Sequence, residues 1–536
     1  MPDVAVVAAA TVGARAHDGY VLLSDLVTTS AAVAGTRSRT AKRDLLASLL
    51  RQCEAAEVEV VVAYLSGETR QRRTGVGWRS LAEPVEPAAV PGLSVLEVDA
   101  ALERLSTLAG AGSQGARRQA LSALFGRATE PEQVFLRGLL TGELRQGALD
   151  GVVLDALAPA LDLPPTAVRR AAMLLGSTAA VAGLARREGT PGLAAVRLQV
   201  GRPVRPMLAG TAADVPAALA KVSPGGDPVV VDTKLDGIRL QVHKQGDDVL
   251  VVTRSLDDIT ARVPEVVEQV RALPARSLVL DGEAIALRPD GRPHPFQVTA
   301  ARTASAADVP ALRTRTPLST VVFDVLHADG DDLLDAPLSE RADRLAAVTP
   351  TELLVPRLVT ADADEAQAFF LDAVAGGHEG VVVKSGDAPY AAGRRGSGWV
   401  KVKPRHTLDL VVLAVEWGSG RRVGWLSNLH LGALADGTVA GDDSGFVMLG
   451  KTFKGLTDEL LSWQTEQLLA REVSRSGHVV RVRPELVVEI AFDGVQTSPR
   501  YPGGVALRFA RVLRYRDDKT ADEADTLSTV LALQAP

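Results

Sequence analysis

The apolar positions of roughly the first 200 residues follow a helical pattern. Alanine and leucine dominate, and apolar residues recur at spacings of three and four, as in 134–140, which predicts amphipathic helices. A helix start is expected at 129–132, where Thr-Glu-Pro-Glu places a proline and two acids near the first turn. The uncharged stretch 171–185 predicts one buried helix, and the proline-rich stretch 84–92 predicts a loop.

Near Pro203 the pattern changes to short runs of β-type residues that are separated by Gly, Asp and Pro. Strands are expected at 229–231, 238–242, 249–252, 278–280, 321–323 and 381–383. Helical spacing at 261–273 and 362–375 lies between these strands. This region is therefore expected to form a mixed α+β domain that ends near Pro404.

The last region, from residue 406, is again rich in strands. They are expected at 410–415, 429–434, 479–482, 486–490 and 507–513, with one helix at 457–472. Five short strands and one helix within about 130 residues predict a small barrel of the oligonucleotide-binding (OB) kind. The sequence therefore predicts three domains, at 1–200, 201–405 and 406–536.

Composition narrows the class of protein. Hydrophobic residues make up 46% and charged residues 23% of the chain, a balance that excludes a mainly disordered protein. The net charge is −6, from 59 Lys+Arg and 65 Asp+Glu. The one cysteine, Cys53, excludes an intrachain disulfide and a four-cysteine zinc site and fits a reducing cytoplasm. No stretch reaches the roughly 18 to 20 apolar residues of a membrane span, so we expect a cytoplasmic protein with no membrane partner.

Lysine is scarce, since only ten of the 59 basic residues are lysines. Arginine stays charged in proteins, whereas lysine can lose its proton and act as a nucleophile. Four of the ten, Lys234, Lys384, Lys401 and Lys403, lie around strands of the middle region. This concentration indicates a site that needs compact ammonium groups, one of which becomes neutral.

The central feature is the segment Lys234-Leu235-Asp236-Gly237 between two expected strands. Asp-Gly favours a tight turn, which leaves Lys234 at the end of a strand with its amine free to project. Strand alternation then places Arg239, Gln241 and His243 on one face, so that Lys234 and Arg239 can face a common cleft. This signal is weak by itself, because a lysine beside a hairpin turn is usually just solvated.

Further polar side chains follow in a consistent order along the expected strands. Arg254 ends one strand, and Glu283 comes just after a bend in another. Glu379 and Lys384 bracket a buried strand, and Trp399 shares one face with Lys401 and Lys403 while the intervening valines point inward. Each has an ordinary alternative, such as a surface ion pair or a solvated strand end, but together they indicate one site.

These motifs resemble a known superfamily. Lys234-Leu235-Asp236-Gly237-Ile238-Arg239 is similar to the signature of the covalent nucleotidyltransferases, which include ATP-dependent polynucleotide ligases and messenger-RNA capping enzymes. The segment 507–511, followed by 517–519, resembles the final motif of the ATP-dependent DNA ligases. Segments 63–67 and 142–147 resemble the helical DNA-binding domain of archaeal, actinobacterial and eukaryotic replicative-type ligases. The resemblance extends from about residue 20 to 527.

The resemblance implies an α+β nucleotidyltransferase domain built on antiparallel sheet, between a helical DNA-binding domain and an OB-fold barrel. It implies that the chain seals nicks in double-stranded DNA as a monomer, joining 3′-hydroxyl to 5′-phosphate with ATP and Mg²⁺. The reaction would pass through a lysine–AMP intermediate on Lys234 and an adenylated DNA. Because an ordinary lysine has a pKa of about 10.4, nearby cations such as Arg239, Lys401, Lys403 and a bound metal are expected to favour the neutral amine.

The resemblance also assigns residues to the site. Those expected at the nucleotide are Asp232, Lys234, Arg239, Arg254, Glu283, Phe323, Arg395 and Lys401. Phe323 would stack on the adenine, while Glu283 and Glu379 would hold Mg²⁺ directly or through water. Arg508 and Arg511 would reach the pyrophosphate when the barrel closes.

Two positions depart from the family pattern. Asp232 stands where relatives often have Glu, and Ala510 replaces a commoner Pro. Arg145 is a candidate contact to the DNA backbone, or alternatively a cation that complements the end of a helix. Such phosphate contacts need only a locally basic surface, so the net charge of −6 does not exclude DNA binding.

Other classes stay open at this point. An RNA ligase or capping enzyme would share the central chemistry but would not explain 200 helical residues in front. An NAD-dependent ligase is disfavoured because those enzymes carry a cysteine zinc site. From a different class, a nucleic-acid scaffold without catalysis would not need every one of these side chains. The sequence leaves open replication, repair or recombination as the physiological role.

Overall fold

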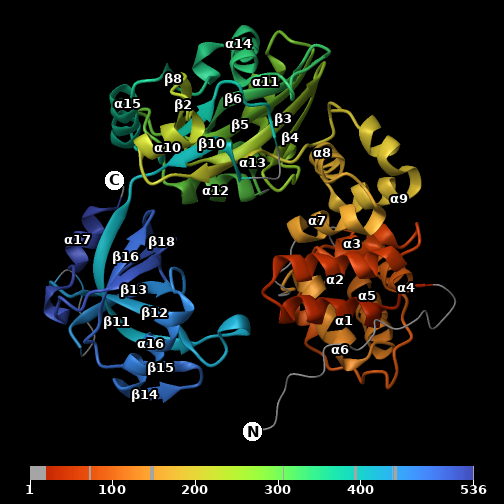
Figure 1. Ribbon diagram of the computed structural model, residues 1–536, viewed down its shortest axis with the longest axis horizontal. Helices are drawn as coiled ribbons and strands as arrows, with labels where there is room; N and C mark the ends of the chain where they lie inside the picture. Colours follow the sequence, from red (N-terminus) through yellow and green to blue (C-terminus); the bar gives the residue numbers. More distant parts are fainter. Residues whose placement is uncertain are drawn as a thin grey trace.

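The computed structural model describes residues 20–534, apart from 72–73, 111, 145–149, 306, 392–394, 438 and 440–443. A helical lobe, a central lobe with β-sheets and a C-terminal β-barrel follow one another along the chain (Figure 1). This is the fold class that the sequence predicts. In the described part of the chain, no helix is long and apolar enough to cross a membrane.

The helical lobe contains the first helices and one 3₁₀ turn, η1. Their bounds are α1 (Leu23–Gly35), α2 (Arg39–Gln52), α3 (Val58–Leu65), η1 (Trp78–Leu81), α4 (Val95–Thr107), α5 (Ser113–Gly126), α6 (Glu130–Thr141), α7 (Asp150–Leu161), α8 (Pro165–Leu175) and α9 (Thr178–Ala195). The start predicted at 129–132 is confirmed, since Thr129 is the N-cap of α6 and proline lies in the first turn. One cluster of buried apolar side chains, most of them aliphatic, joins these helices.

One prediction for this lobe is wrong. The stretch 171–185 is not one helix, because α8 ends at Leu175 and α9 begins at Thr178. Gly176 takes a left-handed conformation with φ 69°, which a glycine adopts without strain. The side chain of Ser177 then accepts a hydrogen bond from the backbone of Ala180 and caps the second helix.

The central lobe contains two five-stranded sheets, in the orders β1-β10-β9-β2-β8 and β4-β3-β5-β6-β7. The strands are β1 (Leu208–Thr211), β2 (Val229–Lys234), β3 (Ile238–Gln245), β4 (Asp248–Thr253), β5 (Ser277–Ala286), β6 (Leu318–Ala328), β7 (Asp331–Asp332), β8 (Arg357–Thr360), β9 (Gly380–Ser385) and β10 (Arg395–Val402). Neighbouring strands are antiparallel except for β1 and β10. All six strands expected here are present.

Helices cover the two sheets of the central lobe (Figure 1). They are α10 (Val215–Val222), α11 (Pro264–Arg271), α12 (Phe296–Ala304), α13 (Val309–Arg315), α14 (Leu338–Val348) and α15 (Ala363–Ala375), with 3₁₀ turns η2 (Thr260–Arg262) and η3 (Thr351–Leu353). The expected helices at 261–273 and 362–375 correspond to α11 and α15. Apolar side chains of α11 pack with those of β3 to β6, whereas those of α10 and α15 pack with those of β2, β9 and β10.

The turn predicted at Asp236-Gly237 is not a hairpin. Strand β2 pairs with β8 and β9, whereas β3 pairs with β4 and β5, so this segment passes from one sheet to the other. A Cβ atom on Gly237 would lie 2.3 Å from the carbonyl oxygen of Ala284 on β5. The glycine is therefore explained by this close approach of two backbones rather than by a tight turn.

Arg239 at the start of β3 lines the cleft together with Lys234, as expected, whereas the residues that follow it, 240–244, are buried on both faces of the strand. Leu240 and Val242 lie in the core with α11. On the other face, the side chain of Gln241 binds the backbone N–H and C=O of Val204 at 2.8 and 3.0 Å, and His243 is also buried.

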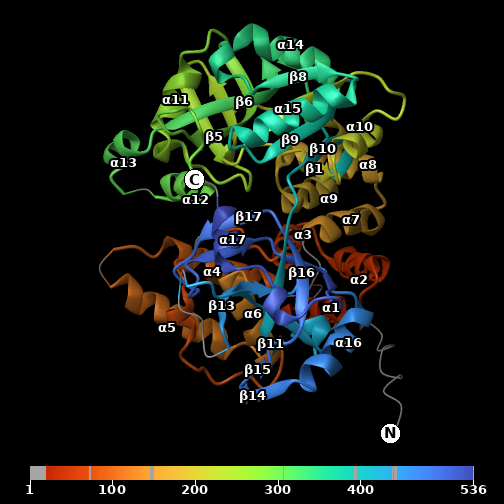
Figure 2. The ribbon, with the colours of Figure 1, turned by 90° about the vertical axis from the view of Figure 1, so that its left-hand side faces the viewer.

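The C-terminal lobe contains strands β11 to β19 and the helices α16 and α17 within the described residues, and part of it is labelled in Figure 2. Their bounds are β11 (His406–Trp417), β12 (Leu426–Leu434), β13 (Phe446–Thr452), α16 (Asp458–Leu469), β14 (Glu472–Ser476), β15 (Val479–Val482), β16 (Val487–Phe492), β17 (Gly494–Thr497), β18 (Val505–Arg508) and β19 (Arg511–Tyr515), followed by α17 (Leu527–Ala532). The run predicted as one strand at 507–513 is divided at Phe509, where φ is 55°. Domain limits near residues 200 and 405 stay predictions.

Candidate active site

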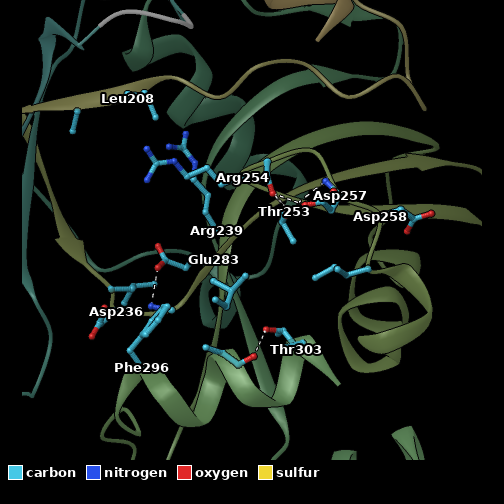
Figure 3. A pocket seen from close by; sticks show the side chains of 18 of the residues that line it. Leu208, Asp236, Arg239, Thr253, Arg254, Asp257, Asp258, Glu283, Phe296 and Thr303 are labelled. Carbon is cyan, nitrogen blue, oxygen red and sulfur yellow. Dashed lines mark hydrogen bonds between the residues drawn. The ribbon is translucent and has the colours of Figure 1, made fainter. Parts of the chain in front are cut away.

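A cleft of about 1540 Å³ lies between the three lobes. The helical lobe lines it with 67–69 and 139–142, and the barrel lines it with Phe509. From the central lobe it is lined by the predicted residues Asp232, Lys234, Arg239, Arg254, Glu283, Phe323 and Lys401. Figure 3 shows part of this cleft, with Arg239 and Arg254 pointing toward the same side and Glu283 lying near Asp236.

Lys234 is the last residue of β2 and reaches the cleft because alternate residues of the strand share a face. Its Nζ forms an ion pair with Glu379 and donates a hydrogen bond to the carbonyl of Leu235 at 3.3 Å. The backbone N–H of Glu379 in turn donates to the carbonyl of Lys234 at 2.9 Å. The partner of this amine is therefore a carboxylate, whereas the sequence predicted a surrounding of cations.

Glu379 is held between two lysines. Lys403 Nζ donates to Glu379 Oε1 at 2.7 Å and to Asp493 Oδ2 of the barrel at 3.1 Å. Burial by itself would raise the pKa of Glu379, but the charges of Lys234 and Lys403 outweigh it and lower this pKa to about 2. Glu379 is therefore ionised at neutral pH, and both of its oxygens have lysine partners.

Glu283 is a second carboxyl group, on β5. Its Oε1 accepts a hydrogen bond from the backbone N–H of Gly237 at 2.8 Å (Figure 3). Burial raises the pKa of Glu283 to about 7, although Lys234 and the Gly237 N–H both lower it. Near neutral pH, this group therefore exists in both protonation states.

The carboxyl groups of Glu283 and Glu379 fit a site for a hard cation that is completed by a substrate. Across the described residues, no three His, Cys, Asp or Glu side chains cluster so that they could hold a metal by themselves. Mg²⁺ usually takes one or two carboxylates, several waters and the phosphates of its substrate. The two carboxyl groups match that pattern, provided that Glu379 gives up one of its lysine contacts.

Arg239 is fixed by partners that sequence reasoning missed. Its Nε and Nη2 donate to the carboxylate of Asp281 at 2.9 and 2.6 Å, and its Nη1 donates to the carbonyl of Met207 at 2.6 Å. Asp281 lies within the motif Leu-Asp-Gly-Glu, where only Glu283 was considered. Strand pairing explains the contact, because Gln241 lies opposite Asp281 and Arg239 is therefore two residues away on the neighbouring strand.

Phe323 on β6, the residue expected at the adenine, packs against Trp399 on β10, and the two rings form an aromatic wall. Their rings meet edge to face with centroids 6.0 Å apart. Lys384 is buried and its Nζ lies 4.6 Å from the centroid of the Phe323 ring and 4.2 Å from that of the Trp399 ring. Lys384 is therefore a support for the aromatic wall and not a solvated strand end.

Asp232 is buried next to Lys384 and has charged partners of its own. Arg357 donates to both carboxylate oxygens at 2.6 and 2.9 Å, and Lys384 Nζ lies 2.5 Å from Oδ2. Burial would raise the pKa of Asp232, but Lys384 and Arg357 outweigh it and keep this pKa below its usual value. Sequence reasoning missed Arg357. The only signal in the sequence was its position as a basic residue at the start of a short apolar strand.

Three more basic residues were predicted at the nucleotide: Arg254, Lys401 and Arg395. Arg254 is exposed in the cleft, and among the described residues no carboxylate forms an ion pair with it. Lys401 lines the cleft, and Val400 and Val402 on either side of it pack into the core, so the predicted alternation of β10 is confirmed. The side chain of Arg395 lies outside the described residues, and its backbone pairs with β1.

The barrel contributes Arg508 to the site. Its Nη1 and Nη2 donate to the carboxylate of Asp236 at 2.7 and 3.3 Å. Arg511 lies 3.6 Å from Asp493, the barrel residue that also contacts Lys403. Lys519, in the second part of the expected final motif, instead binds Asp409 within the barrel at 2.7 Å.

The predicted DNA-binding segment 142–147 is only partly described. Gly142, at the end of α6, lines the cleft together with residues 139–141. Arg145 lies outside the described residues. The segment 63–67 ends α3, and Gly67 with its two following residues also lines the cleft.

Comparison with known proteins agrees with this arrangement. Family models match three parts of the chain: "DNA ligase N terminus" at 79–158, "ATP dependent DNA ligase domain" at 206–403 and "ATP dependent DNA ligase C terminal region" at 422–519. A solved structure named "Pmar-Lig_Pre." has the same fold, with a TM-score of 0.58 and 18% identity over 92% of this chain and 99% of that one.

Two relatives cover nearly the whole chain. A protein of Nocardioides sp. described as "Probable DNA ligase" is 63% identical over 518 residues, which are 96% of this chain and 99% of the relative. A "Probable DNA ligase" of Streptomyces griseus is 56% identical over 521 residues, 96% of this chain and all of the relative. The chain therefore belongs to the ATP-dependent DNA ligase family, enzymes that join DNA and use ATP with Mg²⁺.

Proposed function

We propose that the chain seals nicks in double-stranded DNA through a covalent AMP on Lys234 and then an adenylated DNA end. The observation that supports this most is the place of Lys234, in a cleft lined by all three lobes and beside Glu379. Splitting the joining reaction in this way replaces one difficult step with easier ones, because AMP is a better leaving group than the oxygen of the 5′-phosphate.

In the first step, the lone pair of Lys234 Nζ attacks the α-phosphorus of ATP. A P–N bond forms, the bond to the β-phosphate oxygen breaks, and pyrophosphate leaves. The amine must first lose a proton, and its pairing with the ionised Glu379 opposes that loss. We therefore assign the pairing of Lys234 with Glu379 to the stage before this proton is lost.

Activation then requires that Glu379 gives up its contact with Lys234. When bound, Mg²⁺ neutralises charge on the phosphates of ATP and takes oxygen ligands. Glu379 and Glu283 would hold it, directly or through water. If Glu379 turned from Lys234 to such a ligand role, its carboxylate would no longer pair with the amine that must lose a proton.

The other site residues bind and orient the nucleotide in this proposal. Phe323 offers an apolar face to the adenine, above a support formed by Lys384 and Asp232. Arg239 and Arg254 point into the cleft (Figure 3), where their guanidinium groups can bind ribose or phosphate oxygens. Lys401 and Arg395 are proposed at the phosphates of ATP.

Two transfers complete the joining reaction. An oxygen of the 5′-phosphate at the nick attacks the phosphorus of the lysine–AMP, and the P–N bond breaks as Lys234 regains its proton. The 3′-hydroxyl then loses its proton and attacks the 5′-phosphorus, and AMP leaves. Cations around the cleft stabilise the negative charge that develops on the transferring phosphate.

The helical lobe is proposed to bind the duplex through phosphate contacts. Such contacts are independent of sequence and weaken as salt rises, which suits an enzyme that must act at any nick. Segments 67–69 and 139–142 of this lobe line the same cleft as Lys234. A duplex held by this lobe would therefore lie next to the nucleotide.

The experiment that tests the proposal uses labelled nucleotides and matched substrates. The chain is incubated with α-labelled ATP, GTP or NAD, and then with nicked DNA or nicked RNA. We expect label on the protein only from ATP and sealing only of nicked DNA. Label from GTP would favour a capping enzyme, label from NAD an NAD-dependent ligase, and sealing of nicked RNA alone an RNA ligase. Absence of any label would exclude the covalent mechanism.

A further inference from the structure

Tyr390 belongs to a closed ring of hydrogen bonds around Arg239. Its hydroxyl donates to Asp281 Oδ2 at 2.7 Å and accepts from the backbone N–H of Met207 at 3.0 Å. Arg239 completes the ring, since it donates to Asp281 on one side and to the carbonyl of Met207 on the other, and its Nη2 also makes a long contact of 3.5 Å with the Tyr390 hydroxyl. Tyr390 thus holds both groups that fix the guanidinium.

The ring of hydrogen bonds is buried, so water cannot readily replace a bond that is lost. Tyr390 and Asp281 are each only 1% exposed, and Met207 is 3% exposed. Burial and the neighbouring Asp281 raise the pKa of Tyr390 well above its ordinary value, so its hydroxyl keeps the proton that it donates. A buried carboxylate that loses such a donor keeps its charge without full compensation.

Tyr390 also contacts the aromatic wall. Its ring meets Trp399 edge to face, with centroids 5.9 Å apart, and Trp399 meets Phe323 in the same manner at 6.0 Å. The centre of the Arg239 guanidinium lies 5.5 Å from the centroid of the Phe323 ring. One buried side chain therefore connects the aromatic wall to the arginine beside it.

We infer that Tyr390 is a positioning residue for nucleotide binding, which acts by holding Asp281 so that Arg239 keeps its orientation in the cleft. This inference rests on the proposed role of Arg239 at the nucleotide. Three donors of Arg239 are used by Asp281 and Met207, and the arginine has five in a rigid fork. A small rotation of the guanidinium would therefore misdirect the few donors that are left for ATP.

The test compares the Tyr390→Phe variant of the full chain with wild type in the formation of protein-bound AMP. The variant removes one hydroxyl and keeps the ring that packs against Trp399. We expect the KM for ATP to rise about tenfold while kcat changes less, because one hydrogen bond to an ionised acceptor is lost. All variants are assayed below the temperature at which circular dichroism shows unfolding.

Tyr515→Phe is the matched control. Tyr515 is also buried, and its hydroxyl donates to Gln464 Oε1 at 3.0 Å inside the barrel, away from Arg239. We expect this variant to lose stability to a similar extent while its KM for ATP stays that of wild type. An equal rise of KM in both tyrosine variants would overturn the inference, because it would reflect a general loss of stability.

A double variant tests whether Tyr390 acts through Asp281. If it does, Tyr390→Phe should raise the KM for ATP by less than about twofold when it is introduced into the Asp281→Asn variant. The same factor in both backgrounds would overturn the inference. If Tyr390→Phe has the same KM for ATP as wild type, and AMP is found on Lys234, the inference about Tyr390 is overturned while the proposed function stands. A wild-type chain without AMP on Lys234 would overturn the proposed function and this inference together.

Discussion

Arg508 of the barrel forms a two-pronged ion pair with Asp236, which follows Lys234 by two positions in the chain. A second contact between the lobes lies close by, since Lys403 joins Glu379 to Asp493 of the barrel. Both contacts are polar and partly exposed, so they can break without loss of a hydrophobic interface. The structure thus describes a barrel that contacts the immediate neighbours of Lys234.

The first prediction concerns Arg508. Replacement by alanine removes the contact with Asp236 and a cation that would face the departing pyrophosphate. We expect AMP formation on Lys234 to slow by about a hundredfold. Sealing of DNA that already carries AMP at the nick should change little, because that substrate bypasses the first step. Rapid-quench measurement of both reactions checks this.

Arg514→Ala is the control for Arg508. Arg514 is on β19 of the same barrel and forms an exposed pair with Glu489 at 2.7 Å. Its loss should leave both rates unchanged. If Arg508→Ala slowed both reactions to the same extent, a specific role in the first step would be wrong.

The second prediction concerns the protonation of Glu283. Its pKa is raised from 4.5 to about 7, so the folded state favours the protonated carboxyl group. Loss of this proton as the pH rises therefore lowers the free energy of unfolding, and wild type should become less stable between about pH 5 and pH 8. The Glu283→Gln variant should lack this loss. The difference in melting temperature between the variant and wild type, measured without ATP or metal, should therefore shift in favour of the variant as the pH rises.

The exposed Glu352 provides the matched control for this pH dependence. Glu352→Gln should follow the wild-type curve across the same pH range. A Glu283→Gln curve parallel to wild type would show that the environment of Glu283 does not favour its protonated form.

The third prediction concerns Glu379, whose pKa is lowered from 4.5 to about 2. A carboxyl group with a depressed pKa stabilises the fold above its unfolded pKa, and this contribution is lost as pH falls toward the folded pKa. The stability difference between wild type and Glu379→Gln should therefore stay constant from neutral pH to about 4.5 and shrink below it. Thermal unfolding across this range measures the difference, and a difference independent of pH would contradict the assigned ion pairs.

The fourth prediction concerns Gly237. A methyl group there would lie 2.3 Å from the carbonyl oxygen of Ala284, so β3 and β5 would have to separate. We expect Gly237→Ala to lower the free energy of unfolding by about 1–3 kcal/mol and to abolish AMP formation, because the Gly237 N–H also binds Glu283. Gly151→Ala, in a helix with open space around it, should keep both properties.

Much of the fold follows from local sequence, and the exceptions have physical causes. Alternation and apolar runs predict the strands of the central lobe because each strand buries at least one face. The break at Gly176 was missed because the apolar pattern continues across it, although a glycine there was a visible signal. The break at Phe509 had no such signal, since phenylalanine rarely takes a positive φ.

The site was predictable where its residues lie in one motif. Lys234 and Arg239 share a short segment, and both line the cleft. The pairing of Lys234 with Glu379 depends on strand β9 meeting β2, and sequence spacing does not specify that meeting. Arg357 and Tyr390 were missed for the same reason, because their partners are distant in the chain and become neighbours only in the fold.

The central claim is that Lys234 carries AMP. The most direct measurement is mass spectrometry of peptides from the chain after incubation with ATP and Mg²⁺ in the absence of DNA, for wild type, Lys234→Ala and Lys234→Arg. We predict one AMP on the wild-type peptide that contains Lys234, linked through nitrogen, and none on either variant. A nitrogen-linked AMP that persists in Lys234→Ala, or one that maps to another lysine of wild type, would contradict the account.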